Sequence, residues 1–141
     1  MARIFWDTNL FIYLFEKNVD WSHRVVEFRQ RMLVRGDELR TSWLTVGEVL
    51  TKPKEVRNTT LEKSYLNFFL SGAVSLIPFD FEAANAYAEI RSRERIRPAD
   101  SMQLACAAAA GTDLFVTNDN RLSNLVVPGI TFITGIGRTP Y

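Results

Sequence analysis

The sequence predicts an α/β fold, with a mainly parallel sheet of about five strands flanked by helices on both faces. Short apolar segments alternate along the chain with longer amphipathic segments, the arrangement typical of such folds. The 141 residues suit one domain with a sizeable core, and a content of 47% hydrophobic and 23% charged residues is typical of a globular protein. No repeat or linker divides the chain, so residues 1–141 are expected to form a single domain.

Five short apolar segments are predicted to be strands. Ile4-Phe5-Trp6 has the continuous apolar character of a buried central strand. The last segment is short, which favours a place at the sheet edge. Right-handed crossovers would put the intervening helices on both faces. The predicted strands are 4–6, 39–43, 74–77, 114–116 and 131–133.

The predicted helices follow from apolar spacing and from residues that begin or end helices. Ser22 and Asp80 are suitable N-caps, and Gly72 and Gly111 are suitable stops. Pro53 is expected to end the third helix before it, because proline disfavours a helical residue in front of it. Five predicted helices are 9–15, 23–34, 45–51, 82–93 and 98–109, and a further one begins at Thr59 or Thr60 and is closed by Gly72.

The scarcity of some residue types excludes several kinds of site. His23 is the only histidine, which argues against a histidine-rich zinc site and a serine–histidine triad. Cys106 is the only cysteine, so no intrachain disulfide can form, and its alanine-rich surroundings indicate a buried thiol. Residues 1–15 lack the pattern of a signal peptide, and no apolar run reaches about 18 residues. We therefore expect a cytoplasmic protein without membrane contact.

Four acidic residues are the strongest indication of function: Asp7, Glu48, Asp100 and Asp119. Each lies where a strand should end or in the first turns of a predicted helix. Asp7 and Asp119 follow predicted strands, and ligands of parallel sheets bind outside the carboxyl ends of the strands. Carboxylates gathered there would repel one another unless a hard divalent cation compensated them. The pattern therefore favours metal-dependent cleavage of a phosphodiester.

Each acidic residue also has a purely structural interpretation. Asp7 could cap the helix that follows it, and Asp119 could stabilise a polar turn. Glu48 could close a capping box with Thr45, and the residue pair 100 and 103 could form a similar box. Asp80 also follows a predicted strand, but it is interpreted as a plain helix cap and left out of the site.

Thirteen of the 17 basic residues are arginines, which can bind phosphates through two hydrogen bonds. Two groups lie close in sequence to the acidic residues. Some members are expected to be solvated, and others to contact a nucleic-acid backbone. The groups are Arg91, Arg93, Arg95 and Arg97 before Asp100, and Lys52, Lys54 and Arg57 after Glu48.

Taken in order, these segments resemble the PIN-domain ribonucleases, and most closely the VapC-type toxins. The resemblance covers nearly the whole chain and depends on the ordered set, since no single motif is specific. Trp6 is bulkier than the residue expected before the first aspartate, and Asn118 adds a polar group to the last motif. The matching segments are Ile4-Phe5-Trp6-Asp7-Thr8-Asn9, Thr45-Val46-Gly47-Glu48-Val49-Leu50, Ala99-Asp100-Ser101-Met102-Gln103-Leu104-Ala105 and Leu114-Phe115-Val116-Thr117-Asn118-Asp119.

The resemblance implies an acidic quartet of Asp7, Glu48, Asp100 and Asp119 that binds Mg²⁺ or Mn²⁺, with Asn9 and Thr117 as supporting polar residues. It also implies an endoribonuclease that is the toxin of a type II toxin–antitoxin pair. The expected partners are an RNA substrate, a cognate antitoxin and a second copy of the chain. The apolar residues Phe68, Phe69 and Leu70 are expected to be exposed and are candidates for either protein contact.

The sequence leaves two other functional interpretations open. The first is another metal-dependent nuclease, of the 5′-nuclease or ribonuclease-H type, which would also use carboxylates. The second is a non-catalytic scaffold that binds RNA or a protein partner through the same fold. The presence of all four acidic residues disfavours the scaffold.

Overall fold

The computed structural model describes residues 1–140. These residues contain one five-stranded sheet in the order β3-β2-β1-β4-β5, and every neighbouring pair is parallel. The strands are β1 (Arg3–Trp6), β2 (Glu38–Ser42), β3 (Ser75–Ile77), β4 (Thr112–Thr117) and β5 (Ile130–Gly135). The predicted α/β class is therefore confirmed, and β5 lies at an edge as expected.

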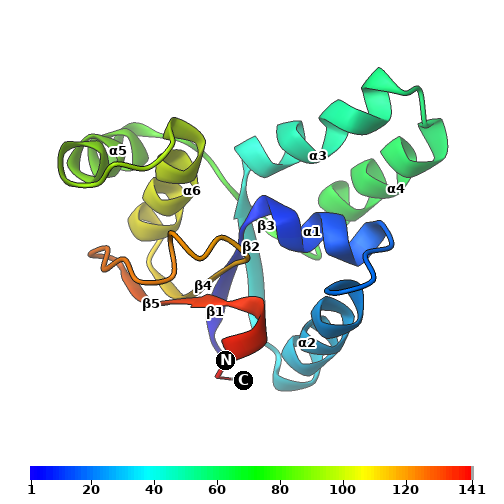
Figure 1. The fold of residues 1–141 in the computed structure, drawn as a ribbon, viewed down its shortest axis with the longest axis horizontal. Coiled ribbons are helices and arrows are strands. Elements are labelled where there is room, and N and C mark those ends of the chain that lie inside the picture. The colour runs from blue at the N-terminus through cyan, green and yellow to red at the C-terminus, as the bar shows by residue number, and fades with distance from the viewer. Residues whose placement is uncertain (141) are drawn as a thin grey trace.

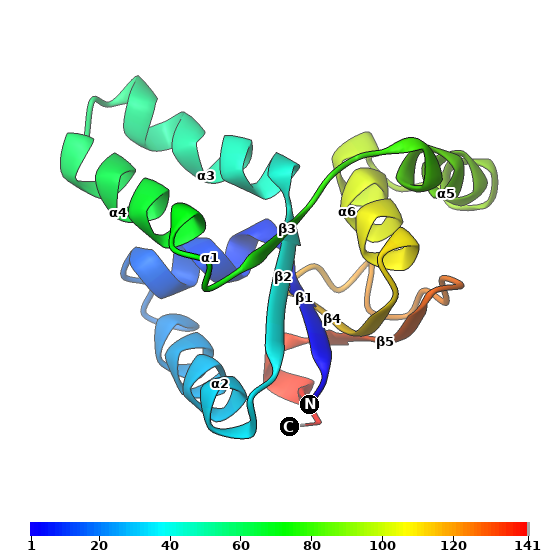
Figure 2. The same cartoon turned by 180° about the vertical axis from the view of Figure 1, so that it is seen from behind.

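Helices cover both faces of the sheet, as Figures 1 and 2 show from opposite sides. The first four helices pack on one face, and the last two pack on the other. The short helix η1 (Ile136–Arg138) follows β5. The helices are α1 (Thr8–Phe15), α2 (Ser22–Arg35), α3 (Trp43–Glu55), α4 (Thr59–Leu70), α5 (Phe81–Arg93) and α6 (Pro98–Ala109).

Alternation along β1 divides the core between the two faces. Ile4 and Trp6 belong to the larger apolar cluster beneath α1, α2 and α4, whereas Phe5 points into the cluster beneath α5 and α6. Phe5 stacks on Phe115 of the neighbouring strand, with ring centroids 5.2 Å apart. All three β1 side chains are fully buried, which fits the continuous apolar run of a central parallel strand.

The predicted end of the third helix before Pro53 is wrong, because α3 continues to Glu55. Pro53 is buried in the last turn, where its missing N–H leaves one carbonyl of the preceding turn without its helical hydrogen bond. Trp43 also begins this helix instead of ending β2. Ser22 is the first residue of α2 and not its cap, since its hydroxyl donates to the carbonyl of Glu16.

The aromatic residues of α4 also differ from expectation. Phe69 is 5% exposed, and Phe68 packs edge-on against Phe15 and Phe69, so both contribute to the core. The cause is an aromatic cluster between α1 and α4, which the local sequence alone does not reveal. Leu70 remains 78% exposed. Among residues 1–140, no helix combines the length and apolar character needed to cross a bilayer.

We expect Gly129→Ala to lower the free energy of unfolding by more than about 2 kcal/mol. Gly129 has a φ of +99°, and a Cβ there would lie 2.5 Å from the carbonyl oxygen of Ala108. Urea denaturation followed by circular dichroism measures the change. The control is Gly47→Ala in α3, where a Cβ would meet no atom within 4 Å and should stabilise the helix by about 0.5–1 kcal/mol. Equal stability of the two variants would contradict the prediction.

Candidate active site

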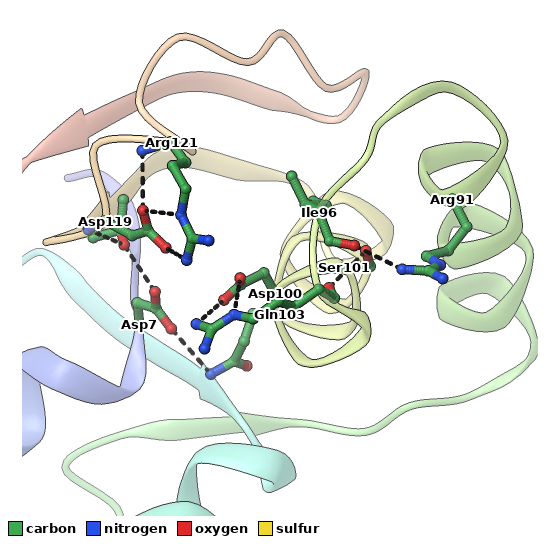
Figure 3. Close-up of polar contacts among 10 residues, drawn as sticks. Asp7, Arg91, Ile96, Asp100, Ser101, Gln103, Asp119 and Arg121 are labelled. Carbon is green, nitrogen blue, oxygen red and sulfur yellow. Dashed lines mark hydrogen bonds and ion pairs between the residues drawn. The ribbon is translucent and has the colours of Figure 1, made fainter.

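Parallel pairing of β1 with β4 brings two of the four acidic residues together. Trp6 lies opposite Val116, and the Asp7 N–H donates to the Val116 carbonyl at 2.9 Å. Asp7 therefore leaves the sheet beside the end of β4, two residues before Asp119. Figure 3 shows both carboxylates near the carboxyl ends of the strands.

The other two acidic residues come from helices. Asp100 lies in the first turn of α6, and Glu48 lies in α3. All four carboxylates line one pocket of about 480 Å³, together with Asn9 of α1. Sequence segments more than 100 residues apart thus contribute to a single concave surface outside the sheet.

Asp7 and Asp100 are the most deeply placed of the four, each with a relative exposure of 7%. Asp7 is fixed by hydrogen bonds. Its Oδ1 accepts a hydrogen bond from the Thr8 N–H at 2.8 Å, so it also caps α1, and its Oδ2 accepts from the Thr117 hydroxyl at 2.8 Å. Burial raises the pKa of Asp7, and the nearby charges of Asp100 and Glu48 raise it further, against these hydrogen bonds. The ionised form is therefore costly in the absence of a cation.

Two of the carboxylates are held by arginines. Arg97 donates to both oxygens of Asp100 at 2.9 and 3.3 Å. Arg121 donates to both oxygens of Asp119 at 3.0 and 2.7 Å, and these bonds lower the pKa of Asp119. Asp119 also accepts from the backbone N–H of Arg121, so the predicted polar turn is present as well.

The two capping boxes suggested by the sequence do not form. The Thr45 hydroxyl accepts a hydrogen bond from Thr41, and Glu48 accepts one from the Thr8 hydroxyl at 2.6 Å. Gln103 is 2% exposed and joins the strands to the helices. Its amide nitrogen donates to Thr45 at 2.7 Å, to Thr8 at 3.1 Å and to Asp7 at 3.4 Å, and its oxygen accepts from the Ser42 hydroxyl.

The predicted supporting residues lie at the pocket, whereas several of the predicted basic residues do not. Asn9 is exposed at the pocket, and Thr117 is fully buried beneath Asp7. Several of the candidate basic residues pair elsewhere: Arg91 with the Ile96 carbonyl, Arg93 with Glu89 and Lys54 with Glu62. Figure 3 shows Arg91 remote from the carboxylates, with its guanidinium directed at the Ile96 carbonyl.

Sequence reasoning missed Gln103, Thr8 and Arg121 as members of the site. The place of Gln103 directly before the run of small apolar residues in α6 was a signal, because a buried amide requires partners. Arg121, two residues after an acidic residue, was a weaker signal. Cys106 is buried as expected, and burial raises the pKa of its thiol to about 11, so it has no nucleophilic role here.

The donor chemistry of the pocket fits a hard divalent cation. Its side chains offer carboxylate, hydroxyl and amide oxygens, the ligands that Mg²⁺ and Mn²⁺ prefer. In residues 1–140, however, no three acidic, histidine or cysteine side chains converge closely enough to share an ion. The arginine pairs explain the spacing, since two of the carboxylates are turned toward guanidinium groups. A cation would require these side chains to rearrange.

A parallel sheet with carboxylates at its carboxyl edge defines this chain as an α/β domain built around an acidic pocket. Residues 4–127 match the model of the PIN domain family, so the chain belongs to that family. Comparison with curated proteins found no significant match.

Solved structures resemble the chain at low sequence identity. VapBC from Salmonella typhimurium bound to DNA superposes with a TM-score of 0.73 at 21% identity, covering 96% of this chain and 99% of that one. VapBC2 from Rickettsia felis, bound to a promoter fragment, gives 0.71 at 19% identity, covering 94% and 97%. VapC20 from Mycobacterium tuberculosis, a toxin that cleaves the sarcin-ricin loop, gives 0.66 at 16% identity, covering 87% and 96%. These likenesses establish the fold.

We expect Gln103→Leu to lower the free energy of unfolding by about 1–3 kcal/mol, because it leaves buried hydroxyls without their partner. Gln30→Leu is the matched control, since Gln30 is exposed on α2 and should change stability by less than about 0.5 kcal/mol. Urea denaturation of both variants measures the difference. Similar losses of unfolding free energy in both variants would show that the hydrogen bonds of Gln103 do not stabilise the fold.

Asp7→Asn should stabilise the protein at neutral pH when EDTA removes cations. The folded pKa of Asp7 is raised, so the folded state binds its proton more tightly than the unfolded chain does. Its contribution favours folding below the ordinary aspartate pKa of about 3.9 and is lost as pH rises through the raised value. The gain from Asp7→Asn should therefore be largest at pH 7–8 and shrink toward pH 4. Denaturation across this range tests it, and a gain independent of pH would contradict it.

Proposed function

We propose that this chain is a metal-dependent endoribonuclease and the toxin of a type II toxin–antitoxin pair. The observation that carries the proposal is the gathering of Asp7, Glu48, Asp100 and Asp119 around one pocket at the carboxyl edge of the sheet. Like charges in one pocket repel, and the ionised form of Asp7 is costly there, so a cation site is the function that explains the gathering of these carboxylates. Membership of the PIN domain family supports the same reading.

In this proposal Asp7 and Asp100 would contact the cation directly, and Glu48 and Asp119 would contact it directly or through water. Mg²⁺ or Mn²⁺ lowers the pKa of a bound water and stabilises charge on the phosphate when it is present. The protein's own contribution is preorganisation. Thr117 fixes one oxygen of Asp7 at 2.8 Å, and Thr8 fixes Glu48 at 2.6 Å, so these two carboxylates are positioned before any substrate arrives.

RNA as the substrate is supported by the family and by the structural likeness to VapC20, which is described as cleaving the sarcin-ricin loop. The chain adds a physical reason, because Arg97 and Arg121 carry positive charge at the mouth of the acidic pocket. Guanidinium groups there can bind backbone phosphates on either side of the scissile bond. Asn9, exposed at the same pocket, is proposed as a supporting polar residue together with Thr117.

An antitoxin partner is supported by the structural neighbours, several of which are toxin–antitoxin complexes, including one from Klebsiella pneumoniae. The proposal extends to a cytoplasmic protein that forms a homodimer. Leu70 is the one member of the predicted apolar group in α4 that remains exposed for a protein contact. Its isolated position makes it a candidate edge of an interface and not a full docking surface.

The test is RNA cleavage by purified protein in Mg²⁺ or Mn²⁺, with EDTA as the metal-free comparison. Asp7→Asn and Asp100→Asn should each reduce cleavage at least about 100-fold, because losing a direct ligand should cost at least as much as losing a supporting residue. Asp80→Asn is the matched control, since Asp80 caps α5 and lies outside the pocket lining.

Cleavage that survives EDTA or both substitutions would overturn the proposed mechanism. RNA binding without cleavage, in wild-type protein that binds Mn²⁺, would instead favour the non-catalytic scaffold. Digestion of DNA in preference to RNA would favour the 5′-nuclease alternative. Each outcome is read on the same preparations, with circular dichroism showing that the variants are folded.

A further inference from the structure

Arg97 and Arg121 hold the acidic pocket in a charge-paired state. Each guanidinium occupies both oxygens of one carboxylate, Arg97 on Asp100 and Arg121 on Asp119. Figure 3 shows Arg121 folded over Asp119 on the side where the other carboxylates lie. The pairs thus engage the same oxygens that a divalent cation would need.

The two pairs are close to each other and open to solvent on one side. The arginine side chains are each 65% exposed, whereas the side chains of Asp100 and Asp119 are 9% and 16% exposed. Arg97 also lies within the electrostatic reach of Asp119, and Arg121 within that of Asp100. Buried carboxylates with exposed partners can exchange those partners without any change in the core.

Both ion pairs form between residues that are close in sequence. Arg97 precedes Asp100 by three residues at the start of α6, and Arg121 follows Asp119 by two in the loop after β4. Long, flexible side chains so close to their carboxylates can swing away by rotation alone, with the backbone unmoved. With Glu48 and Asp7 included, four carboxylates face two guanidinium groups. The formal excess is two negative charges, which one divalent cation balances.

We propose that Arg97 and Arg121 are exchangeable counterions, which neutralise the carboxylates until a divalent cation displaces them and then bind the phosphates of the RNA. The inference deepens the proposed function and rests on it. Each arginine then has two opposite effects. It weakens cation binding, and it strengthens RNA binding. A purely structural pair would instead weaken both when removed, because the carboxylate would lose its position.

The first experiment measures Mn²⁺ binding alone, by isothermal titration calorimetry on the full chain without RNA. Arg97→Gln and Arg121→Gln should each tighten Mn²⁺ binding by about two- to fivefold, the range expected for removing a competing, largely exposed ion pair. The control is Arg95→Gln, since Arg95 is exposed beside the same residues and makes no ion pair with a carboxylate in residues 1–140. It should leave binding unchanged.

The second experiment measures cleavage of a single-stranded RNA at saturating Mn²⁺. Arg97→Gln and Arg121→Gln should raise KM by about two- to fivefold at low salt, with a smaller change in kcat, because they lose phosphate contacts. Arg97→Lys keeps the charge and loses the two-pronged geometry, so its KM should lie between those of wild type and Arg97→Gln.

The outcomes separate the inference from the function on which it rests. Wild-type protein that binds Mn²⁺ and cleaves RNA, with arginine variants whose Mn²⁺ affinity is unchanged or weaker, would overturn the counterion exchange alone. An equal increase in Mn²⁺ affinity in Arg95→Gln would also overturn it, because the cause would then be the loss of any positive charge near the pocket. Wild-type protein that neither binds Mn²⁺ nor cleaves RNA would overturn the proposed function itself.

Discussion

The parallel pairing of β1 with β4 is the constraint on which the rest of this structure depends. It sets the ends of two buried strands side by side, so that Asp7 and Thr117 meet at 2.8 Å although they lie 110 residues apart. The helices α3 and α6 then add their acidic residues from above the same edge. A one-residue change of register would turn the buried side chains of β1 toward the wrong faces and displace Asp7.

The burial of carboxylates lowers the stability of the folded protein and also provides the ligands for a cation. Asp7 is desolvated, and nearby carboxylates oppose its ionisation. A network of hydroxyl groups and the Gln103 amide offsets part of that cost by holding the oxygens in fixed positions. At the exposed rim, Arg121 and Arg97 stabilise the ionised form of Asp119. The pocket that disfavours ionised Asp7 without a cation also supplies the carboxylates that would bind one after Asp100 and Asp119 leave their arginines, so stability and function oppose each other here.

Much of the fold was predictable because its signals are local. Pro98 and Gly111 bracket α6, Asp80 caps α5 as expected, and the apolar runs mark all five strands to within three residues at either end. The four acidic residues were also identifiable as candidates, because Asp7 and Asp119 follow apolar strands and Glu48 and Asp100 lie in apolar helices. Their interpretation as ligands stays a prediction.

The sequence by itself determined the succession of strands and helices along the chain, the apolar faces and the positions of the acidic residues. Only the tertiary structure decided which partners those residues have. Gln103 reads locally as a cap, yet it bonds Thr45 from 58 residues away, and Phe69 reads as exposed, yet α1 covers it. The physical reason is that hydrogen bonding and burial depend on which elements pack together, whereas helix and strand signals depend on neighbours within a few residues.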